Sequence, residues 1–149
     1  MNLSEKINKD MIEAMKSKDT FTLSVIRMVK GAIQLEKINL KRELNDDEVI
    51  SVISKQIKMR NDSISEFSKA NRQDLVDQYK QEIDVLNRYM PEQLSDDEVN
   101  AIIDEAFAKI NPTSPKDMGL IMREVSPKVN GRADKGKVSQ IIKEKLSNL

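Results

Sequence analysis

The chain has 149 residues, of which 34% are charged and 38% apolar, and its 25 basic residues balance 25 acidic ones. This length suits one compact domain or two small ones, and a net charge of zero favours no particular class of partner. The chain has no histidine and no cysteine. Their absence removes the commonest general base, the commonest transition-metal ligand and every thiolate site, so catalysis would have to rest on carboxylates, lysine or tyrosine.

The first six residues, MNLSEK, contain no apolar core of the kind found in secretory signal peptides. No apolar run approaches the roughly 20 residues that a membrane-spanning helix needs. We therefore expect a cytoplasmic protein that makes no contact with a membrane.

Apolar residues recur at helical spacing through the first ninety residues. The spacing predicts helices over residues 3–18, from Asp19 or Thr20 to about Leu40, from the Asn45 cap to Phe67, and from Leu75 to Met90. Asn45 suits an N-cap because its side-chain oxygen can accept an unpaired backbone N–H. Glycine inside a helix costs stability relative to alanine, so we predict that Gly31 marks a site of close packing.

Three further helices are predicted after Pro91. Residues 95–98, SDDE, form a capping box that opens a helix ending near Ile110. Ser114 and Pro115 have the residue types of a cap and a first helical position, and the short helix that they open should end over residues 126–131. Asp134 can cap a last helix that reaches Leu146.

The pattern therefore predicts an all-α protein with two domains. An N-terminal helical domain, residues 1–94, resembles a four-helix bundle with long helices, and a three-helix C-terminal module follows over residues 95–149.

Basic residues gather around Gly131, just before the last predicted helix. They are Lys128, Arg132, Lys135 and Lys137. Backbone N–H groups at a helix start can help side chains to hold a phosphate, and A-form RNA is recognised largely through its phosphates and 2′-hydroxyls. We therefore assign these four cations and Gly131 as a candidate nucleic-acid-binding site. The alternative is that they form the solvated face of a small helix.

A second basic cluster, Lys55, Lys58 and Arg60, lies on the third predicted helix. We interpret it as surface charge or as ion pairing between helices. The acidic triplets at residues 46–48 and 96–98 fall at helix starts, where capping and the helix dipole account for them, and we expect no metal site.

Three segments carry distinctive motifs, namely residues 89–95 with the sequence YMPEQLS, residues 117–122 and residues 128–134. The first is similar to the Y-[LM]-P-E-Q-L-S junction of the YqeY family, and the other two are similar to the D-M-G-x-x-M and G-[RK]-A-D patterns of that family. Lys135 departs from the family pattern, in which glycine is frequent at that place. The resemblance implies an all-helical, two-domain cytoplasmic protein. It also implies that the C-terminal part is related to the tail domain of the GatB subunit of the tRNA-dependent amidotransferase, an appended module that contacts tRNA.

We therefore expect a non-catalytic accessory protein of tRNA metabolism, which binds tRNA or a tRNA-charging or amidotransferase partner through the C-terminal module. We expect no cofactor and no DNA partner, and the sequence makes no prediction of the oligomeric state. Two alternatives stay open. One is a protein–protein adaptor that acts through the N-terminal bundle. The other is a carbon–nitrogen ligase of the amidotransferase type with glutamine as amide donor, although cysteine is absent and the serines lie mostly at caps or on polar faces.

Overall fold

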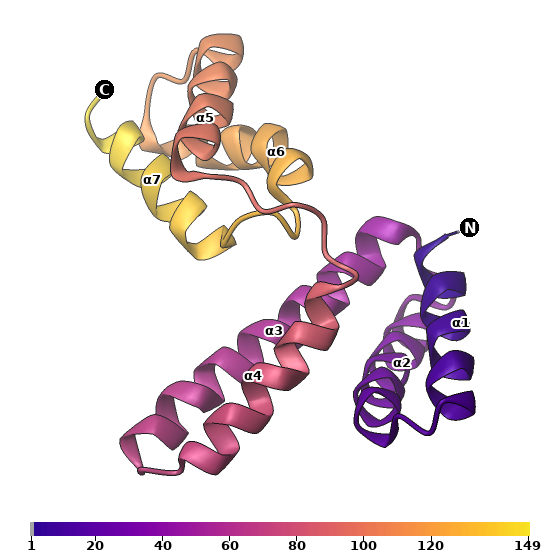
Figure 1. Cartoon of the computed structure of the whole chain (residues 1–149). Coiled ribbons are helices and arrows are strands. Elements are labelled where there is room, and N and C mark those ends of the chain that lie inside the picture. Colours follow the sequence, from indigo (N-terminus) through magenta and orange to yellow (C-terminus); the bar gives the residue numbers. More distant parts are fainter. Residues whose placement is uncertain (1) are drawn as a thin grey trace. The chain divides into compact units, whose positions relative to one another are not determined.

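The computed structural model describes residues 2–149, and within them it contains seven α-helices, one short 3-10 helix and no strand. The all-α prediction is confirmed. The chain divides into two compact units, Met1–Met90 and Pro91–Leu149 (Figure 1). Within the described residues, no helix combines the length and the apolar composition needed to cross a membrane.

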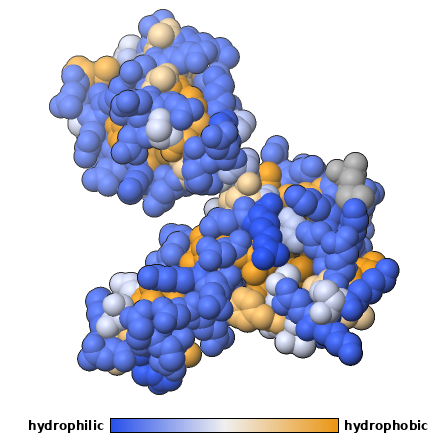
Figure 2. Space-filling view, viewed as in Figure 1, coloured by the Kyte–Doolittle hydropathy of each residue, from blue (hydrophilic) through white to orange (hydrophobic). Residues whose placement is uncertain are grey.

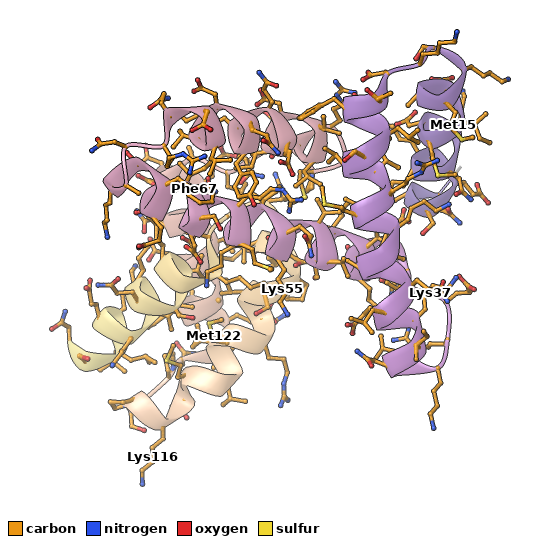
Figure 3. All side chains as sticks on the ribbon, turned by 90° about the horizontal axis from the view of Figure 1, so that it is seen from below. Met15, Lys37, Lys55, Phe67, Lys116 and Met122 are labelled. Carbon is orange, nitrogen blue, oxygen red and sulfur yellow. The ribbon has the colours of Figure 1, made fainter. Side chains whose placement is uncertain are left out.

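The N-terminal unit contains two antiparallel helical hairpins (Figure 1). Its helices are α1 (Leu3–Lys16), α2 (Thr20–Leu40), α3 (Asp46–Lys69) and α4 (Gln73–Asn87). Viewed from below, α2 runs across α3 rather than along it (Figure 3). The core lies where the hairpins meet and contains Ile7, Val25, Ile26, Val29, Ile33, Val49, Ile53, Val85, Leu86 and Tyr89. Apolar residues also reach the surface of this unit (Figure 2).

Local capping explains where these helices begin. The Asn45 side chain accepts the Glu48 N–H at 2.9 Å, and the Glu48 carboxylate accepts the Asn45 N–H in return. Asp19, rather than Thr20, caps α2 by accepting the Thr22 N–H at 3.1 Å. The fourth helix ends at Asn87, three residues earlier than predicted, because the chain turns before Pro91 and a residue that precedes proline avoids the helical conformation.

The C-terminal unit packs three helices around a core of its own. They are α5 (Asp96–Ile110), α6 (Met118–Val129) and α7 (Lys135–Ser147), with the 3-10 helix η1 (Pro115–Asp117) leading into α6. The buried residues are Val99, Ile103, Ala106, Ile121, Val125, Val129, Val138, Ile142 and Leu146. The capping box predicted at Ser95 is present, since Ser95 Oγ accepts the Glu98 N–H at 3.1 Å.

Ser114 and Pro115 cap and open a helical segment as predicted, but that segment is the 3-10 helix η1, and α6 follows it from Met118. α6 ends at Val129, inside the predicted range of residues 126–131. It continues through Pro127 because a proline in the last turn removes little of the hydrogen-bond ladder while Val125 and Val129 stay buried. One local prediction is wrong. Gly31 is exposed, and a Cβ atom placed on it would meet no neighbouring atom within 4 Å, so nothing in this chain packs closely there.

Candidate nucleic-acid interface

The five predicted site residues lie along one segment of the C-terminal unit. Lys128 is in the last turn of α6, Gly131 and Arg132 are in the loop, and Lys135 and Lys137 begin α7. Gly131 is buried and has a φ of 71°, a left-handed conformation that glycine adopts without strain. The turn after α6 therefore depends on glycine at this position.

Arg132 is tied to the segment that enters the unit from Pro91. Its Nε donates to the Glu92 backbone oxygen at 3.1 Å, and its own backbone oxygen accepts the Leu94 N–H at 2.8 Å. Gln93 Nε2 donates to the Gly131 backbone oxygen at 2.8 Å. We call this set of three hydrogen bonds, between residues 92–94 and 131–132, the loop clamp.

The loop clamp gives the two most distinctive sequence motifs a shared structural role. Residues 92–94 come from the YMPEQLS segment, and residues 131–132 come from the GRAD segment, about forty positions later. Sequence reasoning did not bring them together, because nothing in the spacing of either motif identifies its partner. Gly131 and the Arg132 Nε therefore hold the unit together, and neither is free for a ligand.

Lys128 forms a long ion pair with Glu124. Its Nζ lies 3.6 Å from Glu124 Oε1, and Lys109 Nζ lies 3.0 Å from the same oxygen. The hydrogen bond from Lys109 is the main reason that the pKa of Glu124 lies below its usual range, with the charge of Lys128 adding to it. Glu124 thus offsets part of the positive charge at this end of α6.

The start of α7 already has an anionic cap. Asp134 Oδ1 accepts the Gly136 N–H at 2.8 Å. A carboxylate in that place complements the helix dipole and occupies a backbone donor that a phosphate would need. The predicted help from backbone N–H groups is therefore reduced, and phosphate binding here has to rest on side chains.

Lys135 and Lys137 are the two site residues that remain accessible. Both are exposed, and neither has an ion pair or side-chain hydrogen bond within residues 2–149. Positions two apart point to different sides of a helix, so the two ammonium groups suit two separate phosphates better than one.

The described part of the chain contains no candidate metal site, since nowhere in it do three Asp or Glu side chains converge. A shallow polar hollow in the N-terminal unit is lined by Asp10, Glu13, Ser17, Asp19 and Arg88, among others. Beside it, the Tyr89 hydroxyl donates to Asp10 Oδ2 at 2.6 Å, and burial of the ring raises the pKa of Tyr89.

Comparison with known proteins gives one family and several relatives. The family model for YqeY-like proteins matches residues 4–146. Three relatives are named "Altered inheritance of mitochondria protein 41, mitochondrial". The Pyrenophora tritici-repentis protein is 31% identical, and the match covers 93% of this chain and 78% of the relative. The Candida glabrata protein is 34% identical over 61% of this chain and 51% of the relative. The Lachancea thermotolerans protein is 28% identical over 85% of this chain and 68% of the relative.

These names contradict the predicted cytoplasmic location, because they place the relatives in mitochondria. The prediction rested partly on the missing apolar signal core and partly on the family resemblance. Mitochondrial transit peptides are amphipathic and contain no such core, so that observation bears on secretion alone. The match over residues 4–146 shows that the chain belongs to the YqeY-like family.

Proposed function

We propose that the chain is a non-catalytic accessory protein of tRNA metabolism, and that its C-terminal unit contacts the phosphate backbone of tRNA. The supporting observation is that Lys135 and Lys137 are exposed at the start of α7 without a partner in residues 2–149. They follow directly on the motif whose resemblance implies a tRNA-contacting module. Lysine side chains at such a place bind backbone phosphate without reading the base sequence.

The charge of the whole unit limits how strong this contact is. Residues 91–149 contain nine basic and ten acidic side chains, a difference of minus one. The unit as a whole therefore does not attract RNA, and the attraction comes from the local cations at α7. We expect weak binding that decreases steeply with salt, because it depends on displaced counterions.

The test is filter binding of the full chain to total tRNA over a salt series. The double variant Lys135→Gln and Lys137→Gln should weaken binding and reduce the slope of log affinity against log salt by about 2, roughly one for each lost phosphate contact. Arg132 stays unchanged in this variant because its Nε belongs to the loop clamp.

A matched control removes the same charge from the other unit. Lys55 and Lys58 are exposed on α3, and neither has an ion pair or side-chain hydrogen bond in the described residues. Replacing both with glutamine should leave the salt slope unchanged. Equal losses in the two double variants would show non-specific charge attraction, and binding that ignores salt would exclude the phosphate contact.

A second candidate function is a protein–protein adaptor that acts through the N-terminal unit. Within the described residues, eight of the ten exposed large apolar side chains belong to this unit, including Ile12 and Met15 of α1. Glutamate at these two positions should abolish capture of a partner from native lysate treated with ribonuclease. Capture that depends instead on Lys135 and Lys137, and disappears with ribonuclease, would favour the tRNA proposal.

A further inference from the structure

The outer face of α2 is almost free of charge. Of the eleven exposed residues of this helix, which is described throughout, only Arg27 is charged, whereas 34% of the whole chain is charged. A solvated helix face normally carries charged residues. Depletion of charge is characteristic of the centre of a protein interface.

Large apolar side chains on this face recur at the spacing of a coiled-coil seam. Phe21, Met28 and Leu35 are seven residues apart, and they are 37%, 45% and 61% exposed. Ser24, Gly31 and Ile38 occupy the alternate positions, and Ile38 is 61% exposed. We call these six residues the α2 seam. Apolar residues repeating every three and four positions form a stripe that packs against another helix.

Gly31 lies in the middle of the α2 seam and has no role within the chain. Glycine there weakens the helix, and a Cβ atom would meet no neighbouring atom within 4 Å. Its backbone is helical and not left-handed, so conformation does not require glycine either. Glycine at this position would let a helix from outside the chain approach the α2 backbone closely.

The α2 seam fits against a second α2 seam that runs in the opposite direction. A two-fold axis between Val29 and Lys30 pairs Met28 with Gly31 and Ser24 with Leu35, while Phe21 meets Ile38 at each end. Each of the two central pairs thus places a long side chain opposite a small one, as close helix packing requires. An unrelated partner helix would not need this reversal symmetry, whereas an isologous dimer does.

We propose that a second copy of this chain packs antiparallel against α2, with the α2 seams of the two copies in contact. In this register the one charged residue, Arg27, faces Gln34 of the second copy at the edge of the seam, so no like charges are opposed. Opposite ends of the two helix dipoles also come together. α2 has 21 residues and is about 31 Å long, so the contact is smaller than a standard interface and the dimer is weak.

The first test uses the absence of cysteine from the chain. The double variant Ser24→Cys and Leu35→Cys should form a disulfide-linked dimer under mild oxidation, because the two positions meet across the axis. Each single variant should not, since the two copies of either position are separated by about 16 Å along the helices. A link in a single variant would exclude the antiparallel register. No link in the double variant would exclude the dimer.

The second test measures association directly, by sedimentation velocity of the full chain from micromolar to millimolar concentration. Leu35→Glu should weaken the dimer about a hundredfold, because it places a carboxylate in the apolar seam. Adding Ser24→Lys should restore much of the loss, since the new charges meet between copies. The control Leu120→Glu, at an exposed leucine of the C-terminal unit, should have no effect. A chain that stays monomeric at millimolar concentration would overturn the proposal. So would a dimer that Leu35→Glu weakens and that Ser24→Lys does not restore.

Discussion

Arg60 of α3 and Glu82 of α4 form an ion pair inside the N-terminal unit, with Arg60 Nε 3.1 Å from Glu82 Oε1. Their side chains are only 10% and 5% exposed. Gln56 accepts from the Arg60 Nη1 through both its backbone and its side-chain oxygen, and Gln78 Nε2 donates to the other Glu82 oxygen. The pair therefore joins α3 to α4 in surroundings that satisfy both charges.

Removing one member of this pair should be strongly destabilising. Arg60→Met leaves the Glu82 carboxylate buried without its cation, which costs about 3–5 kcal/mol of unfolding free energy. The double variant Arg60→Met and Glu82→Leu should recover most of that loss, because it leaves no uncompensated charge. Urea denaturation followed by residue-resolved hydrogen exchange measures both values.

The control is the exposed pair of Lys69 and Glu66, whose side chains are 72% and 75% exposed. Breaking it should change stability by at most about 0.5 kcal/mol. If Arg60→Met costs as little as the control, the buried pair contributes no more than a surface contact.

The loop clamp makes a structural prediction for Arg132 that is separate from RNA binding. Arg132→Ala removes the hydrogen bond from its Nε to the Glu92 oxygen and should destabilise the C-terminal unit by about 1 kcal/mol. The Leu94 amide, which donates to Arg132, should then exchange faster with solvent. Lys135→Ala is the control and should leave Leu94 exchange unchanged, because that side chain has no described partner. Unchanged exchange in both variants would contradict the clamp.

Glu48 at the start of α3 carries a prediction about pH. Two hydrogen bonds of 2.7 Å from the Arg42 guanidinium, followed by one from the Asn45 N–H, lower the pKa of Glu48 from 4.5 to about 2. A pKa that is lower in the folded state contributes stability above the unfolded value, and this contribution is lost as pH decreases from 4.5 to 2. A carboxylate NMR titration should place the pKa of Glu48 near 2.

Arg42→Gln tests the cause of that shift. The pKa of Glu48 should move back toward 4.5, although the Asn45 N–H still holds it somewhat below. The stability difference between Arg42→Gln and the unaltered chain should also shrink as pH decreases through about 2 and vanish well below it, where Glu48 is protonated in both. A difference that persists at lower pH would mean that Arg42 acts through something other than this carboxylate.

The starts of α3 and α5 were predictable because their determinants are local. Asn45 and Ser95 each bind an amide three residues away, so a four-residue window contains the whole interaction. The loop clamp was not predictable in this way, because its two segments lie about forty residues apart.

Exposure along α2 was only partly predictable. Ile26, Ile33 and Ile38 all recur at helical spacing, yet Ile38 is 61% exposed while Ile26 and Ile33 are buried. α2 has apolar residues on both of its faces. The periodicity of the apolar residues therefore identifies α2 as a helix but does not show which of its two apolar faces packs in the core. The buried face depends on where α1, α3 and α4 lie.

Replacing Gly31 or Gly131 with alanine should change the free energy of unfolding in opposite directions. Gly31→Ala should increase stability by up to about 1 kcal/mol, because a Cβ atom at this exposed helical position meets nothing within 4 Å and alanine favours the helix. Gly131→Ala should decrease stability by about 1–2 kcal/mol, since alanine is strained at a φ of 71°. Hydrogen exchange in urea, monitored for amides of each unit, reports the two effects separately. A gain at Gly131, or a loss at Gly31 at concentrations where the chain is monomeric, would show that the local backbone differs from the one described.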